Sequence, residues 1–141
     1  MDNQIIMVCL DEDHAIDKNL TGLVATKIAN EYQKPTLILN KTIENNEIIW
    51  SGSGRIFSQS AFITFRSFLE DSGYFLFAQG HEGAFGAAIK DIDITPFTLF
   101  ANIRLASFDF SQKYFIDLIY DAEILTADDI YQIANYDGLW G

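Results

Sequence analysis

The sequence predicts an α/β fold, with a central mixed β-sheet flanked by helices. Short apolar runs alternate along the chain with segments whose apolar residues recur at helical spacing, which is the order of a sheet covered by helices. The 141 residues are 49% hydrophobic, enough for one packed domain and the start of a second. Charged residues make up 21% of the chain, and no long low-complexity run occurs, which argues against disorder.

Each element follows from a local pattern. The apolar runs that predict strands are residues 5–10, 36–39, 48–50, 74–78 and 87–90. Asp17 or Asn19 is the expected cap of a first helix that Pro35 ends. A second helix is expected from about Ser60 to Glu70, where Ser72-Gly73 stops it, and Thr95-Pro96 is expected to open a third.

Two polar or glycine-rich stretches are expected to leave the sheet. Asn40–Glu47 predicts a turn, and the Ser/Gly-rich segment Ser51–Arg55 predicts a loop after the third strand. Phenylalanines at helical spacing are expected in the core: Phe62, Phe65, Phe97 and Phe100.

The end of the chain has a different pattern. Phe115, Leu118 and Ile119 predict one more strand, and Thr126–Asp129 resembles a capping box before a final helix. We therefore expect one domain over residues 1–107. Residues 108–141 are expected to be a linker and the beginning of a following module, cut short within a longer natural chain.

The segment Gly80-His81-Glu82-Gly83-Ala84-Phe85-Gly86 is the most informative for function. Three glycines within seven residues predict a turn at a strand end that lets another atom approach the backbone. Backbone N–H groups exposed in such a turn favour an anion, and His81 adds a donor that can carry charge near neutral pH. Phosphate is the ligand that these features predict.

Charge and cysteine content restrict the class of protein. A formal net charge of −11 argues against a broad basic face that grips nucleic acid. A narrow phosphate site stays open, because salt screens charges beyond about 8 Å. The single Cys9 can form no disulfide within the chain and is expected to be buried, which fits a cytoplasmic setting. No apolar run reaches the roughly 20 residues that span a bilayer, so no membrane partner is expected.

Three segments, in order, resemble the DHH-associated C-terminal domain of the DHH phosphoesterases, most closely that of RecJ-type single-stranded-DNA exonucleases. They are Gly22–Ala29 with the following Lys34-Pro35-Thr36, Gly52–Arg55, and Gly80–Gly86. The resemblance covers about residues 5–105. It departs at Gln79, where the family has glycine, and at Phe85, which replaces a small alanine and adds either bulk beside the pocket or a ring for a base.

The resemblance implies a domain that binds substrate for a metal-dependent exonuclease. Catalysis in the family belongs to an upstream DHH domain, so Mn²⁺ or Mg²⁺ is expected there, none in this chain, and this chain alone is expected to be inactive. Arg55 and His81 are then expected to hold phosphate oxygens of single-stranded DNA or a short oligonucleotide. The other expected site residues are Ser53, Gln79, Gly80 and Gly86.

Other interpretations of these residues stay open. Arg55 can be a surface ion pair, His81 a buried histidine bonded to backbone, and the glycines a sign of tight strand packing. The cluster of Asp11, Asp13 and His14 is better explained as a solvated loop than as a metal site. Arg66 and Arg104 are expected on solvated helix faces.

Two other functions also stay open. One is the substrate domain of a phosphoesterase that acts on short oligonucleotides, cyclic dinucleotides or pyrophosphate. The other is an interaction module with no phosphate ligand.

Overall fold

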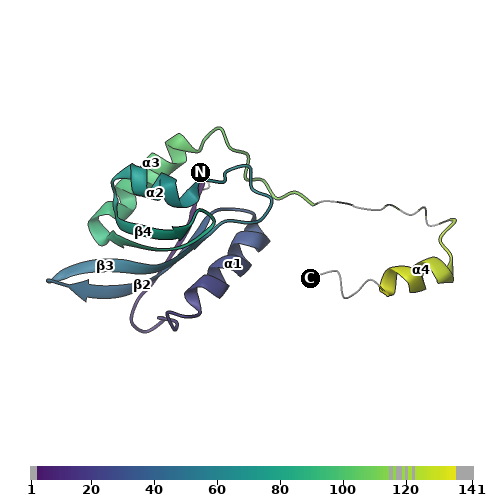
Figure 1. The fold of residues 1–141 in the computed structure, drawn as a ribbon, viewed down its shortest axis with the longest axis horizontal. Coiled ribbons are helices and arrows are strands. Elements are labelled where there is room, and N and C mark those ends of the chain that lie inside the picture. Colours follow the sequence, from purple (N-terminus) through teal and green to yellow (C-terminus); the bar gives the residue numbers. More distant parts are fainter. Residues whose placement is uncertain (1–2, 115, 117–118, 120, 122, 136–141) are drawn as a thin grey trace.

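The computed structural model describes residues 3–114, 116, 119, 121 and 123–135. Five strands form one open sheet in the order β1-β2-β3-β5-β4, with helices on both faces, which confirms the predicted α/β class (Figure 1). The elements are β1 (Ile6–Leu10), α1 (Thr21–Tyr32), β2 (Thr36–Glu44), β3 (Glu47–Arg55), α2 (Phe65–Ser72), β4 (Phe75–His81), β5 (Ala84–Lys90), the 3-10 turn Asp91–Asp93, α3 (Ile94–Arg104) and α4 (Ala127–Ala134).

The sheet is mixed, as expected. β1 pairs parallel to β2, and every other neighbouring pair is antiparallel. The helical crossover that a parallel pair requires is α1, which lies between β1 and β2 in the chain.

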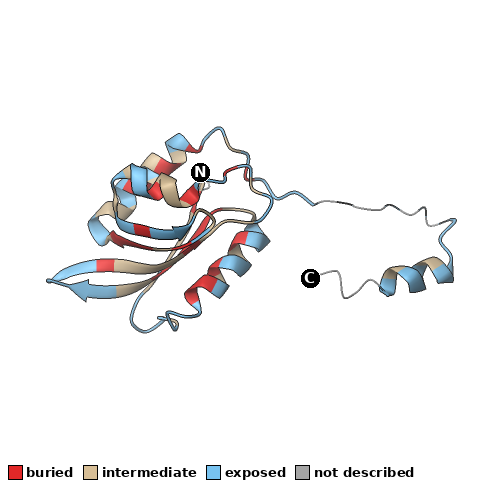
Figure 2. Cartoon of the chain, viewed as in Figure 1, coloured by how far each residue is buried: buried red, intermediate tan, exposed pale blue. Residues whose placement is uncertain are grey.

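The two faces of the sheet are covered by different helices. On the core face, Leu37, Phe85 and Ile89 pack with Phe65 of α2 and Phe97 of α3. The opposite face, called here the α1 face, carries α1, which contacts β2 and β3. Figure 2 shows the buried residues of α1 on the side of the helix turned to the sheet. On the α1 face of β4 and β5, the side chains of Phe77, Gln79, His81 and Ala84 are exposed, while Ala88 is buried.

Two expected turns are strands. β2 continues through the polar stretch as far as Glu44, and only Asn45 and Asn46 form the turn, with φ of 50° and 63°. Asparagine tolerates this left-handed conformation, and two such residues in a row make the turn that matches strand twist. Ser51–Arg55 is likewise part of β3 rather than a loop, because it pairs with β2 on one side and β5 on the other. Polarity misled the prediction here, because backbone pairing with the neighbouring strands holds these polar residues and glycines in the sheet.

The glycine-rich turn is shorter than predicted. Gly80 lies inside β4 and Gly86 inside β5, and the connection is Glu82-Gly83 alone. The hairpin therefore carries most of the glycine-rich segment as paired strand.

The helix starts also differ from the predictions. Leu20, not Asp17 or Asn19, occupies the N-cap of α1, and the Asp17 carboxylate accepts a hydrogen bond from the Asn19 N–H one turn earlier. α2 begins at Phe65 because Ser60 holds Phe62 in a tight turn, with its hydroxyl bonded to both the N–H and the carbonyl oxygen of that residue.

The start of α3 also differs from the prediction, whereas two other helix ends agree with it. Asp93 rather than Thr95 caps α3, because the 3-10 turn leads directly into that helix. Gly73 ends α2 with φ of 76°, as predicted. The capping box between Thr126 and Asp129 is confirmed at the start of α4, which has no buried residue.

The aromatic core is confirmed, and the placement of Cys9 is wrong. Phe62, Phe65 and Phe97 are buried, and Phe100 packs against them half-buried. Cys9 is exposed, because β1 is an edge strand and the helices of the core face do not cover this end of it. Of the strand predicted near Phe115, Phe115 and Leu118 lie outside the described residues.

The position of Phe85 requires glycine at two neighbouring residues. Its buried ring packs edge-on against Phe65 with ring centroids 5.1 Å apart. A methyl group at Gly54 would overlap this ring, and one at Gly80 would lie 2.9 Å from Phe85 Cα. Gly80 also has φ of 133°, where side chains are strained. Phe85 is therefore a core residue seated between two glycines and offers no ring to a base.

We expect Gly54→Ala to lower the free energy of unfolding by about 1–3 kcal/mol, because the added methyl overpacks against the Phe85 ring. Urea denaturation measures the change. Gly86→Ala is the matched control, since its methyl meets nothing closer than 3.7 Å. In a Phe85→Leu background Gly54→Ala should cost less. An equal cost in both backgrounds would contradict this cause.

Candidate phosphate site on the alpha1 face

Arg55 and His81 lie on the same face of the sheet. Both are paired with Ala84, Arg55 from β3 and His81 from β4. Residues directly opposite in neighbouring strands point to the same side, so the two side chains flank Ala84 with their backbones about 10 Å apart, twice the strand spacing. His81 and Ala84 are exposed. The row therefore lies at the edge of the area that α1 leaves open.

The guanidinium group of Arg55 is held by backbone. Its Nη1 donates to the carbonyl oxygen of Gly54 at 2.7 Å and to that of Phe85 at 3.4 Å. Nη2 lies over the first turn of α1, so close that a methyl group at Gly22 would collide with it and lie 3.2 Å from Cζ. Glycine at this helix position is what allows the arginine to lie there.

The charge of Arg55 has no acidic partner. Arg55 takes part in none of the ion pairs among the described residues, although the chain has 20 acidic residues against nine Lys and Arg. The N-terminal end of a helix is itself positive, so the first turn of α1 adds to the charge of Arg55 rather than opposing it. Leu20 at the N-cap offers no side-chain acceptor to the N–H groups of that turn. The two positive features therefore favour an anion between them.

Ser53 ties the strand to α1. Its hydroxyl lies 2.8 Å from that of Thr21, and Thr21 donates its proton to the Lys18 carbonyl oxygen. Ser53 is then the donor to Thr21, which leaves it as an acceptor toward a ligand. Its contribution to the geometry is to hold the N-terminus of α1 against β3.

The remaining predicted residues separate by face. Gln79 is exposed and shares a row with Gly86 and Ser53 on the α1 face. Gly80 is paired with Phe85 on the alternate row, and its role is to seat that ring on the core face. The structure thus brings Arg55, His81, Gln79, Gly86 and Ser53 together and leaves Gly80 behind them.

The hairpin turn that follows His81 is anchored to α2 through Glu82. The Glu82 carboxylate accepts from the backbone N–H of Ser67 at 3.0 Å and from the Ser67 hydroxyl. Arg66 donates to the same carboxylate at 2.9 Å and to Glu70 at 2.7 Å. Arg66 is therefore not a solvated side chain as predicted but a link between α2 and the hairpin. The bonds from Ser67, with the nearby charge of Arg66, lower the pKa of Glu82 below its usual 4.5.

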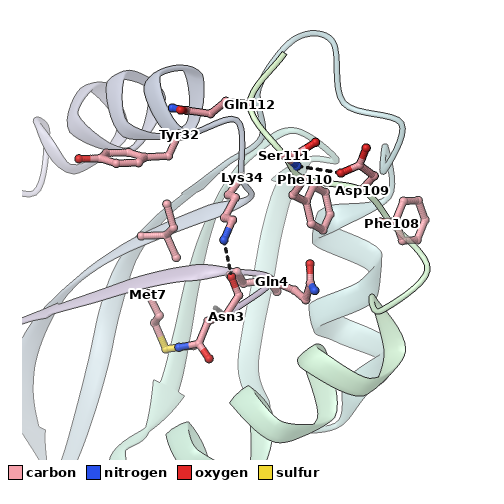
Figure 3. Close-up of a pocket in the computed structure, with 12 residues that line it drawn as sticks. Asn3, Gln4, Met7, Tyr32, Lys34, Phe108, Asp109, Phe110, Ser111 and Gln112 are labelled. Carbon is pink, nitrogen blue, oxygen red and sulfur yellow. Dashed lines mark hydrogen bonds between the residues drawn. The ribbon is translucent and has the colours of Figure 1, made fainter. Parts of the chain in front are cut away.

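A wide groove lies elsewhere. It measures about 780 Å³ and runs beside β1, between the end of α1 and residues 108–112 (Figure 3). Lys34 is its one lysine or arginine, and its Nζ donates to the carbonyl oxygen of Asn3. None of the six residues predicted for the phosphate site lines this groove.

The acidic loop before α1 contains a histidine–carboxylate contact. His14 Nδ1 lies 2.7 Å from an Asp11 carboxylate oxygen, and both side chains are exposed. Within the part of the chain that the structure describes, no group of three or more His, Cys, Asp or Glu residues is placed to hold a metal ion.

Sequence reasoning missed the contribution of α1. Gly22 opens the first of the three segments that carry the family resemblance, yet it was not assigned to the site. A glycine at the second position of a helix, where alanine has the higher propensity, was the available signal. Thr21, buried beside it, could be found only from the packing of α1 on β3.

The chain is similar to two curated proteins. They are "Putative SPbeta prophage-derived single-strand DNA-specific exonuclease YorK" of Bacillus subtilis (strain 168) and "Putative single-strand DNA-specific exonuclease yorK" of Bacillus phage SPbeta. Each is 31% identical over 140 residues, which are 99% of this chain and 24% of the relative. The chain thus spans about a quarter of the length of these relatives. No protein-family model matches it.

The described helices do not meet the requirements for crossing a membrane. None of them combines the length and the apolar character that a bilayer-spanning helix needs.

We expect Glu82→Gln to destabilise the chain at neutral pH and to have less effect in acid. Because the pKa of Glu82 is lowered on folding, its stabilisation is present above about pH 4.5 and is lost as pH falls through the folded-state value. Urea denaturation of both proteins between pH 7 and pH 3 measures this. Glu44→Gln, at the exposed end of β2, controls for the lost charge. A stability difference that stays constant to pH 3 would contradict the assignment.

Proposed function

We propose that this chain is the single-stranded-DNA-binding domain of a RecJ-like exonuclease, which positions the strand for a metal-dependent DHH domain elsewhere in the parent protein. Similarity to two proteins named as single-strand DNA-specific exonucleases supports the choice of nucleic acid. In this proposal the chain binds and orients the strand, and hydrolysis belongs to the DHH domain.

One observation carries the proposal: Arg55 is held against the N-terminus of α1 and, among the described residues, forms no ion pair with a carboxylate. Nη1 is occupied by backbone oxygens, while Nη2 and Nε keep donors for two oxygens of one phosphate. The positive end of the helix beside the guanidinium group favours an anion at this place. His81 is exposed on the same row and adds a second donor to the strand.

The shape of the face favours a polymer. The α1 face is open over β4 and β5, and exposed residues border it at Gln79, His81 and Ala84. A strand can therefore enter and leave the site along the sheet, whereas a pocket for a small phosphoester would enclose its ligand.

The test is a fluorescence-anisotropy titration of the 141-residue chain with labelled dT12. We expect Arg55→Ala to weaken binding about 10-fold or more, because it removes a charged hydrogen-bonding partner of phosphate. His81→Ala should weaken binding less. The apparent affinity should fall as salt rises, with a shallower slope for Arg55→Ala. Arg104→Ala is the matched control, since Arg104 is exposed on α3 across the sheet.

Three results would overturn the proposal. Equal weakening by Arg55→Ala and Arg104→Ala would show a general charge effect. Competition by mononucleotides or pyrophosphate as strong as by dT12 would favour a small phosphoester as ligand, and binding of neither would favour an interaction module.

We also expect Gly22→Ala to weaken dT12 binding as much as Arg55→Ala while the fold is kept. The new methyl group displaces the guanidinium group from the first turn of α1, and alanine itself suits a helix. Circular dichroism checks the fold, and Ala25→Gly, on the same helix, controls for altered helix stability. Unchanged binding by Gly22→Ala would show that the position of the Arg55 guanidinium group against the first turn of α1 does not matter for binding.

A further inference from the structure

Phe77 is the one exposed phenylalanine among the described residues, with 42% of its surface accessible. It is paired with Ala88, and in sequence it lies two residues before Gln79 and four before His81. All three side chains therefore point to the α1 face, where α1 does not cover them. Phe77 is about 13 Å along the strand from the row of Arg55 and His81.

A β-bulge sends Phe77 to that face. Phe75 pairs with Ile89 on the core face, and the register shifts between Phe75 and Phe77, so Phe77 pairs with Ala88. In a regular strand these two phenylalanines would share one side. With the extra residue, Phe75 packs in the core against Phe97, with ring centroids 4.8 Å apart, while Phe77 faces solvent. Bulges often re-aim a side chain beside a functional site.

The surface next to the ring is uncrowded at Gly86. A methyl group there would find only the Gly52 carbonyl oxygen at 3.7 Å and Phe77 Cε2 at 4.0 Å. Gln79 and Ser53 are the residues paired with Gly86 on its two sides.

We propose that Phe77, beside the uncrowded surface over Gly86, binds a nucleobase of the strand whose phosphate lies at Arg55. This inference rests on the proposed function of the α1 face. An exposed aromatic ring suits the π-face that every base presents, so stacking tolerates all sequences. Exposed Gln79 supplies donors and an acceptor for polar edges of the base or sugar. The face then recognises nucleotides by phosphate and base in separate places, rather than phosphate alone.

The test compares dT12 with an abasic 12-mer that carries the same number of phosphates. The wild-type chain should bind dT12 about 5- to 100-fold more tightly than the abasic strand. Phe77→Ala and Phe77→Leu should remove this preference and leave abasic binding unchanged, and Phe77→Tyr should keep it. Leu99→Ala removes exposed apolar surface from α3, on the other side of the sheet, and should change neither affinity.

The outcomes separate the two proposals. Equal binding of both strands by the wild-type chain, each weakened by Arg55→Ala, would overturn the base site and leave the proposed function in place. The base site would also be overturned if Phe77→Leu and Phe77→Tyr both lost affinity for dT12 and for the abasic strand. Binding of neither strand would overturn the proposed function and, with it, this inference. Thermal unfolding of each variant verifies that a folded chain is compared.

Discussion

The packing of Phe85 between Gly54 and Gly80 is the interaction on which the rest of this structure depends. Its ring occupies the core face where β3, β5 and β4 run side by side, and the glycines leave it the space. Because side chains alternate between faces, seating Phe85 on one side fixes the neighbouring rows on the other. A slip of one residue would bury the charged and polar side chains of the α1 face and expose the ring. The core contact thus sets the register in which Arg55 and His81 flank Ala84.

The register that places Arg55 and His81 beside Ala84 matters because of the charge of Arg55. Among the described residues, four of the nine lysines and arginines form ion pairs: Arg66 bonds two carboxylates, and Lys41, Lys90 and Lys113 bond one each. Arg55 differs from these ion-paired side chains because backbone oxygens orient its guanidinium group and the helix end beside it is also positive. A narrow positive site on an acidic chain suits a ligand gripped at a few phosphates, with much of the contact supplied by uncharged groups. Under the proposed function, the acidic remainder of the surface repels nucleic acid and so restricts nonspecific binding.

The hairpin of β4 and β5 is restrained at both ends. At its tip, Glu82 fastens the turn to the first turn of α2 through Ser67 and Arg66, so the strand end that bears His81 is held in place. At its base, the bulge before Phe77 divides two phenylalanines between the faces. Both restraints act on β4, an edge strand that would otherwise be free to fray on its outer side.

The sequence by itself determined the α/β class, the aromatic core and the pairing of Arg55 with His81 as candidates, because apolar periodicity and glycine spacing are local signals. It misplaced the strand limits at Glu44 and Arg55, because polar strands within a sheet lack those signals. Only the tertiary structure decided that Gly80 serves the core while Gly86 faces the site, since a glycine carries no side chain to mark its side. The same holds for Gly22. The need for glycine there follows only from the packing of α1 on β3, which places the Arg55 guanidinium group against Gly22. Such contacts join residues far apart in the chain, and pairing register rather than local propensity fixes them.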